Sequence, residues 1–274
     1  MNLCVSNIAW SGLGTNQSYQ RYELVRNGIT SVELAPALTW LNPDKVTSKQ
    51  NEEVREFWGS QGIEIKALQS LFFGRPDLQL FEDKDNRRAM FEYFAALANS
   101  AAEIGASVLV FGSPKNRIKG EMSKAEADFI ALDFFGELSE EIDDLDVVIA
   151  IEPNPPIYFA DYLVSAQEVI DFVKVLNREN IRMNFDLACS FLASEDPSDM
   201  LHKASEFVAH IHISEPNLGP ISELRMPHEK FAQAIEQNRK SLQGVTVSME
   251  MRDPTPHTNL VSDSISIFKD IYES

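Results

Sequence analysis

Cysteine and positive charge are both scarce in this sequence. Cys4 and Cys189 are its only cysteines, which gives neither a disulfide framework nor zinc-finger spacing, so we expect a reducing, cytoplasmic environment. Asp and Glu number 42 against 24 Lys and Arg, and the formal charge is −18. This balance disfavours DNA or another polyanion as a partner. It does not exclude a small substrate in a metal site, because the ion itself supplies positive charge.

Long hydrophobic runs and targeting segments are also lacking. No stretch is long and apolar enough to span a bilayer. The first ten residues alternate as a strand does and lack the basic start and apolar core of a signal peptide. We therefore expect neither a membrane nor a nucleic acid as a partner.

The sequence does contain a regular alternation of predicted strands and helices. Eight short apolar runs predict strands, each followed by a helical pattern; they cover residues 2–8, 29–34, 63–68, 106–111, 147–152, 181–186, 208–214 and 245–250. This count and order predict an α/β fold, a (β/α)8 TIM barrel that forms a single domain over residues 1–274. A doubly wound open sheet is the alternative, but the Gly-x-Gly of residues 12–14 lacks the rest of its phosphate-binding fingerprint.

Four consecutive predicted strands end in possible metal ligands, namely Glu152, Asp186, His212 and Glu250. In a parallel barrel these ends meet at one face, where active sites lie. Carboxylates gathered there repel one another unless a divalent cation lies among them. The oxygen-rich set with one histidine suits one divalent ion, Mn²⁺ in the first place, with Mg²⁺, Co²⁺ or Zn²⁺ as alternatives.

Other interpretations of these residues stay open. Glu152 and Glu250 could instead form structural ion pairs with Lys or Arg. For residues 210–212, we interpret the strand alternation as pointing one imidazole into the barrel and the other toward the helices. On that basis His212 is the expected ligand and His210 is structural.

Five short segments resemble motifs of the sugar phosphate isomerase/epimerase family, the xylose isomerase-like branch of TIM barrels. They are residues 31–34, 151–154, 184–186, 210–212 and 248–250. The resemblance implies that Glu152, Asp186, His212 and Glu250 hold one divalent metal ion. It also implies that Glu152 and Glu250 act as the acid–base pair, and by analogy that the chain forms a homodimer or homotetramer.

The expected substrate-binding residues are less well defined. The ketose 3-epimerases of this family typically have Glu, His and Arg where this chain has Tyr158, Cys189 and Leu218. Glu33 either supports a ligand or binds substrate hydroxyls, and Cys189 is either a site residue or a plain loop thiol. The full set of candidates is Glu33, Tyr158, Cys189, Arg225, His228, Arg252 and His257, the last of which could also be an exposed loop residue.

The favoured function is that of a metal-dependent isomerase or epimerase of a sugar, keto-sugar or sugar phosphate. A proton is removed beside a carbonyl, and the resulting enediolate is reprotonated. The same intermediate can expel a β-hydroxyl, so a sugar or inositol-derivative dehydratase is an alternative. A ligand-binding barrel without turnover is a second one. DNA repair of the endonuclease IV type is disfavoured by the five histidines and the charge of −18.

Overall fold

In the computed structural model, which describes residues 2–13, 16–255 and 259–273, eight parallel strands close into a barrel in the order β1 to β8. The strands are β1 (Asn2–Ser6), β2 (Ser31–Leu34), β3 (Glu64–Leu68), β4 (Val108–Phe111), β5 (Val148–Ile151), β6 (Ile181–Asp186), β7 (Val208–Ser214) and β8 (Thr246–Glu250). All eight predicted strands are present, and the closed barrel excludes the open sheet. The predicted (β/α)8 fold is confirmed.

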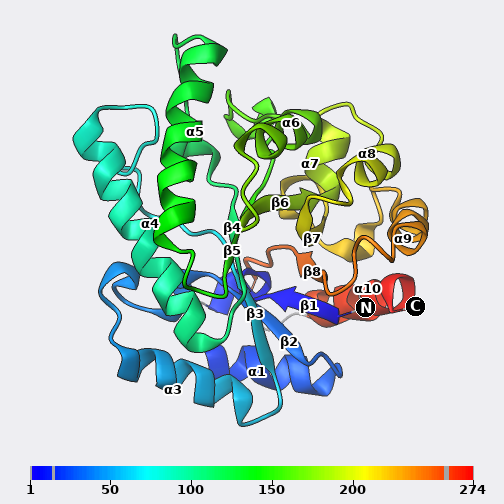
Figure 1. Ribbon diagram of the computed structural model, residues 1–274. Coiled ribbons are helices and arrows are strands. Elements are labelled where there is room, and N and C mark those ends of the chain that lie inside the picture. Colours follow the sequence, from blue (N-terminus) through cyan, green and yellow to red (C-terminus); the bar gives the residue numbers. More distant parts are fainter. Residues whose placement is uncertain (1, 14–15, 256–258, 274) are drawn as a thin grey trace.

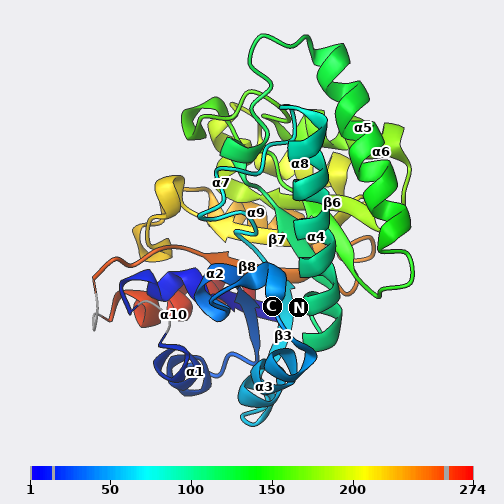
Figure 2. The ribbon, with the colours of Figure 1, turned by 90° about the vertical axis from the view of Figure 1, so that its left-hand side faces the viewer.

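Helices connect successive strands and surround the barrel, as Figures 1 and 2 show from two directions. They are α1 (Gln17–Arg26), α2 (Pro36–Thr39), α3 (Ser48–Gly59), α4 (Lys84–Ile104), α5 (Lys124–Glu141), α6 (Ala166–Leu176), α7 (Leu187–Leu192), α8 (Pro197–Ala204), α9 (His228–Gln237) and α10 (Leu260–Tyr272). Among the described residues, no helix combines the length and the apolar character needed to cross a bilayer.

Local capping explains several helix boundaries. The side chains of Thr47 and Ser123 each accept a hydrogen bond from the backbone three residues later and begin α3 and α5 with a capping box. Gly105, with φ of 85°, ends α4 in the left-handed region. The first predicted strand is two residues too long, because a 3₁₀ segment starts at Asn7.

The strand register places the predicted site residues side by side. Asp186 on β6 pairs with His212 on β7, and Ser214 on β7 pairs with Glu250 on β8. The apolar core lies mostly between the strands and the helices, whereas a smaller cluster of Ala67, Val108, Val110 and Ala150 forms a separate group on β3 to β5. Polar residues lie at the carboxyl ends of the later strands, where β6, β7 and β8 end in Asp186, Ser214 and Glu250.

Candidate active site

Glu152 follows β5, and neutral amides hold both of its carboxylate oxygens. Asn154 Nδ2 donates to Oε1 at 2.9 Å, and Asn184 Nδ2 donates to Oε2 at 2.6 Å. The buried guanidinium of Arg117 donates to the carbonyl of Glu152 at 2.6 Å and to Oδ1 of Asn154 at 2.8 Å. Since Oδ1 of Asn154 accepts from Arg117, its Nδ2 faces Glu152. These contacts fix the position of the carboxylate.

Asp186 ends β6 and also caps α7. Its Oδ1 accepts from the backbone N–H of Cys189 at 2.6 Å, and its Oδ2 accepts from Oγ of Ser214 at 2.7 Å. Burial raises the pKa of Asp186, and the negative charge of Glu152 raises it further. The carboxylate is thus well positioned but short of positive charge.

His212 is fully buried and lies between carboxylates on both sides. Its Nε2 is 3.0 Å from Oε1 of Glu33, whereas its Nδ1 is 3.0 Å from Oε2 of Glu152 and 3.5 Å from Oε2 of Glu250. Burial disfavours the charged imidazole, but Glu33 and Glu250 outweigh this effect and raise the pKa of His212 well above its usual value. A histidine whose Nε2–H donates to a carboxylate while Nδ1 faces the ligand cluster has the geometry of a metal ligand.

Glu33 supports His212 from within the barrel. Its Oε2 accepts from Oγ of Ser248 at 2.9 Å, and its Oε1 is 3.2 Å from Nε2 of His210. Burial would raise the pKa of Glu33, but His212 and His210 lower it, so the carboxylate stays ionised. Of the two roles expected for Glu33, its contacts favour support of His212, because it is fully buried and does not line the cavity described below.

The predicted orientation of His210 is wrong. Both histidines of β7 are fully buried, both lie against Oε1 of Glu33, and their ring centroids are 5.2 Å apart. Residues two apart on a strand share a face, so the alternation could not have sent His210 toward the helices once His212 points inward. His210 is therefore a part of the polar interior of the barrel, where burial lowers its pKa.

The donor set fits a divalent cation. Burial raises the pKa of Glu250 to about 8; Glu152 and Asp186 add to the rise while His212 opposes it. The carboxylates therefore raise the pKa of one another, which a bound cation would reverse. Within the described part of the chain, no Lys or Arg forms an ion pair with these carboxylates. The alternative that Glu152 and Glu250 form structural ion pairs with Lys or Arg is therefore excluded. Glu152, Asp186 and His212 each offer one donor atom within 4.8 Å of the others.

A cavity of about 370 Å³ opens above this cluster, at the carboxyl ends of the strands. Its walls come from the loops after β3, β4, β5, β6, β7 and β8. The predicted site residues that line it are Glu152, Asp186, Glu250, Tyr158, Cys189 and Arg252. The hydroxyl of Tyr158 accepts a hydrogen bond from the backbone N–H of Asn217 at 2.9 Å, and burial raises the pKa of Tyr158 to about 12. The phenol is thus neutral and ties together the loops after β5 and β7.

Besides Glu33, two expected substrate-binding residues are not brought to the cavity. Arg225 is exposed and pairs with Glu223. His228 is buried, with Nε2 2.8 Å from Oε1 of Glu215 and Nδ1 2.9 Å from the hydroxyl of Tyr272. Because Glu215 lines the cavity, His228 contacts a residue of the cavity wall without lining the cavity itself. A third candidate, His257, lies outside the described residues.

Sequence reasoning assigned no role to the residues that hold the candidate ligands in place. Asn184, Ser214 and Ser248 stand two positions from Asp186, His212 and Glu250 respectively, on the same strand faces. The period-2 alternation could therefore have found them. Arg117 gives no such signal, since it reaches Glu152 from a separate loop, 35 residues earlier in the chain.

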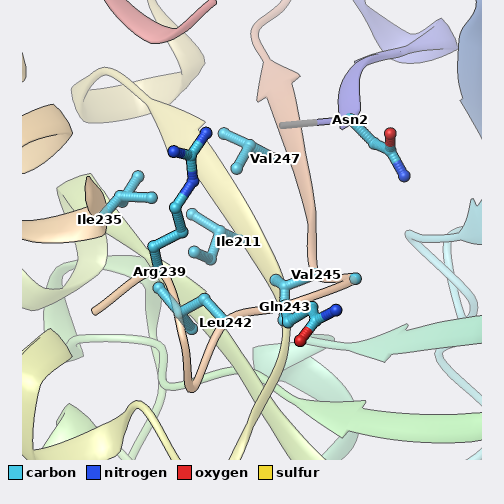
Figure 3. A pocket seen from close by; sticks show the side chains of 9 residues that line it. Asn2, Ile211, Ile235, Arg239, Leu242, Gln243, Val245 and Val247 are labelled. Atoms are coloured by element: carbon cyan, nitrogen blue, oxygen red, sulfur yellow. The ribbon is translucent and has the colours of Figure 1, made fainter. Parts of the chain in front are cut away.

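A second hollow lies at the opposite, amino end of the barrel. Figure 3 shows its aliphatic lining, with Ile211, Ile235, Leu242 and Val247 around the side chain of Arg239. No carboxylate or histidine lines this pocket among the described residues. In TIM barrels this end is concerned with stability, so the carboxylate-lined cavity is the candidate active site.

Comparison with known proteins agrees with this architecture. The xylose isomerase-like TIM barrel model matches residues 22–271, and the chain belongs to this family. A D-psicose 3-epimerase crystallised in the presence of D-fructose has a TM-score of 0.82 at 15% identity, with 100% of each chain covered. The 3-keto-D-glucoside 4-epimerase YcjR from E. coli gives 0.79 at 12% identity, covering 98% of this chain and 99% of its own.

A third solved structure, of the IolI protein with a bound zinc atom, gives a TM-score of 0.76 at 16% identity and covers 100% of this chain and 98% of its own. At such identities the likeness shows the fold alone. No curated protein matches the sequence.

Proposed function

We propose that this protein is a divalent-metal-dependent isomerase or epimerase of a small carbohydrate. One observation carries the proposal: Glu152 and Glu250 line the same cavity, and both approach Nδ1 of His212, at 3.0 and 3.5 Å. Two carboxylates beside one small-molecule cavity supply the groups needed to remove and return a proton. Two structural neighbours, a D-psicose 3-epimerase and a 3-keto-D-glucoside 4-epimerase, support the same class of reaction.

The residues that would hold the ion are Glu152, Asp186, His212 through Nδ1, and Glu250. We favour Mn²⁺ for this oxygen-rich set, with Mg²⁺, Co²⁺ or Zn²⁺ as alternatives; the zinc atom in the IolI structure supports a divalent ion in this fold. When bound, the ion would polarise the substrate carbonyl and stabilise an enediolate. Glu33 would hold the Nε2–H of His212 and keep Nδ1 free to bind.

Glu152 and Glu250 would carry out the proton transfers. One of the two glutamates would take the proton from the carbon beside the carbonyl, and the other would return a proton. Return to the same carbon from the opposite face gives an epimer, and return to the neighbouring carbon exchanges ketose and aldose. Glu152 would be held in position during proton transfer by Asn154, Asn184 and Arg117. The two free, buried cysteines are compatible with the cytoplasmic location that we propose.

Hydrogen exchange in deuterated water tests this proposal. The protein is loaded with Mn²⁺ and incubated with a panel of ketoses, aldoses and their phosphates, and carbon-bound deuterium is followed by NMR. We expect deuterium to enter beside the carbonyl of at least one sugar. Product analysis then separates an epimer or isomer from the dehydrated product of a lyase. A stoichiometrically bound metal that supports no exchange on any sugar would favour the non-catalytic barrel.

A further inference from the structure

Arg252 differs from every other arginine of the chain in the surroundings of its side chain. The other arginines each place the guanidinium against a carboxylate, a carbonyl, a hydroxyl or an amide oxygen. Within the described part of the chain, the guanidinium of Arg252 has no hydrogen bond and no ion pair. In a protein with a formal charge of −18, acceptor oxygens are abundant, so an arginine whose guanidinium contacts none of them is unusual.

Arg252 also stands at a particular place, two residues beyond Glu250 at the carboxyl end of β8. It is exposed and lines the cavity, and it is the one cationic residue among the described residues of the cavity wall. Its backbone is fixed, because its N–H donates to the carbonyl of Leu218 at 2.8 Å and the following N–H, of Asp253, donates to the carbonyl of Ala9 at 3.0 Å. These bonds fix the point of the cavity wall from which the side chain of Arg252 extends.

Among the described residues, the guanidinium of Arg252 forms no ion pair with the carboxylates of the cavity. Glu152, Asp186, Glu215 and Glu250 contribute carboxylates to its lining, and a negatively charged group would be repelled there. The unpaired guanidinium is the place in the wall where such a group is stabilised. Its planar fork binds carboxylates and phosphates through two parallel hydrogen bonds.

We propose that Arg252 binds an anionic group, a carboxylate or a phosphate, on the carbohydrate substrate. The substrate is thus an acidic sugar or a sugar phosphate that places its charged end at Arg252 and its carbonyl near Glu152 and Glu250. This assignment rests on the proposed function. It makes Arg252 a determinant of substrate specificity, whereas Glu152 and Glu250 transfer the proton.

The test uses three ketoses that differ only at carbon 6: D-fructose, D-fructose 6-phosphate and D-fructuronate. Calorimetry measures their binding to the Mn²⁺-loaded protein, and deuterium incorporation measures turnover of any that react. We expect the phosphate or the carboxylate to bind more tightly than fructose, and the better of the two identifies the anion. In Arg252→Ala this preference should fall about 10- to 100-fold, with the affinity for fructose and for Mn²⁺ unchanged. Arg252→Lys should keep part of it, as a point charge does.

Arg239→Ala is the matched control, because it removes the same charge at the opposite end of the barrel (Figure 3). It should leave the preference intact. The inference is overturned if neither anion binds better than fructose, or if Arg252→Ala and Arg239→Ala reduce the preference equally. It is also overturned if Arg252→Ala weakens Mn²⁺ binding instead, since the charge then serves the carboxylates. Binding that depends on Arg252 without any deuterium exchange would contradict the proposed reaction but not the anion site.

Discussion

Gly112 and Glu152 follow the neighbouring strands β4 and β5 and approach each other so closely that a Cβ on Gly112 would lie 2.7 Å from Oε1 of Glu152. The same Cβ would be 3.5 Å from Oδ1 of Asn154. The backbone of Gly112 does not lie in the left-handed region, so the closeness of the carboxylate, and not the local conformation, requires a glycine. Glu152 thus occupies the space that a side chain directly after β4 would fill.

Gly112→Ala should displace the Glu152 carboxylate and weaken metal binding by about tenfold or more, in the range seen when groups around a metal ligand are lost. Gly136→Ala in α5 is the control, because a Cβ there meets nothing within 4 Å. That variant should bind metal normally and gain about 0.5–1 kcal/mol of stability. Calorimetric titration with Mn²⁺ and thermal unfolding measure both effects. Equal metal affinity in the two variants would contradict the placement of Glu152 in the site.

Glu152→Gln and Glu250→Gln should each abolish most of the hydrogen exchange. Gln keeps an oxygen ligand and the shape but cannot accept the proton, so exchange should fall about 10²- to 10⁴-fold. Metal affinity should fall less, and it is measured on the same preparations to separate the two effects. If only one variant loses exchange, that Glu is the base for the substrate tested. Full activity in both would show that the proton is handled elsewhere.

Glu33→Gln should weaken metal binding about 10- to 100-fold, although Glu33 is not expected to touch the ion. The substitution removes the negative charge that holds the Nε2–H of His212 at 3.0 Å. Ser248→Ala removes one hydrogen bond to Glu33 and should have a smaller effect. Titrations with Mn²⁺ and Zn²⁺ compare the three proteins. An unchanged affinity in Glu33→Gln would assign Glu33 a purely structural role.

The metal-free protein should lose stability as the pH rises. The pKa of Glu250 is raised from 4.5 to about 8 in the folded chain, so between these values the unfolded chain has released a proton that the folded chain keeps. The stability contributed by this group is complete below pH 4.5 and is lost as the pH rises through about 8. Thermal unfolding in chelator should show a shallower decline for Glu250→Gln than for the wild type, and parallel declines would contradict the assignment.

The sequence was sufficient to predict the barrel and the position of the candidate ligands at its strand ends; that they bind a metal stays a prediction. Parallel strands buried on both faces appear as apolar runs, and a carboxylate or imidazole at the end of such a run stands out, as with Glu152 and His212. The barrel then brings these ends together whatever the side chains between them. That residues 1–274 make a single cooperative unit stays a prediction, which coincident unfolding transitions by two probes would check.

The rest depended on contacts between loops, which have no period in the sequence. Arg225 and Arg252 looked equivalent as candidates, yet a neighbouring glutamate neutralises the first and the second lines the cavity. His228 looked like a site residue but is enclosed by Glu215 and Tyr272. Arg117 and Gly112 looked unremarkable, because their importance arises from the position of Glu152 alone.

The link from Tyr272 through His228 to Glu215 has a practical consequence for work with this protein. Tyr272 is fully buried in α10 although it stands close to the carboxyl terminus, and its hydroxyl supports a residue of the cavity wall through one imidazole. Loss of Tyr272 would therefore alter the site itself. Any variant of the chain has to keep α10 intact through Tyr272, so that this helix keeps its place against the barrel.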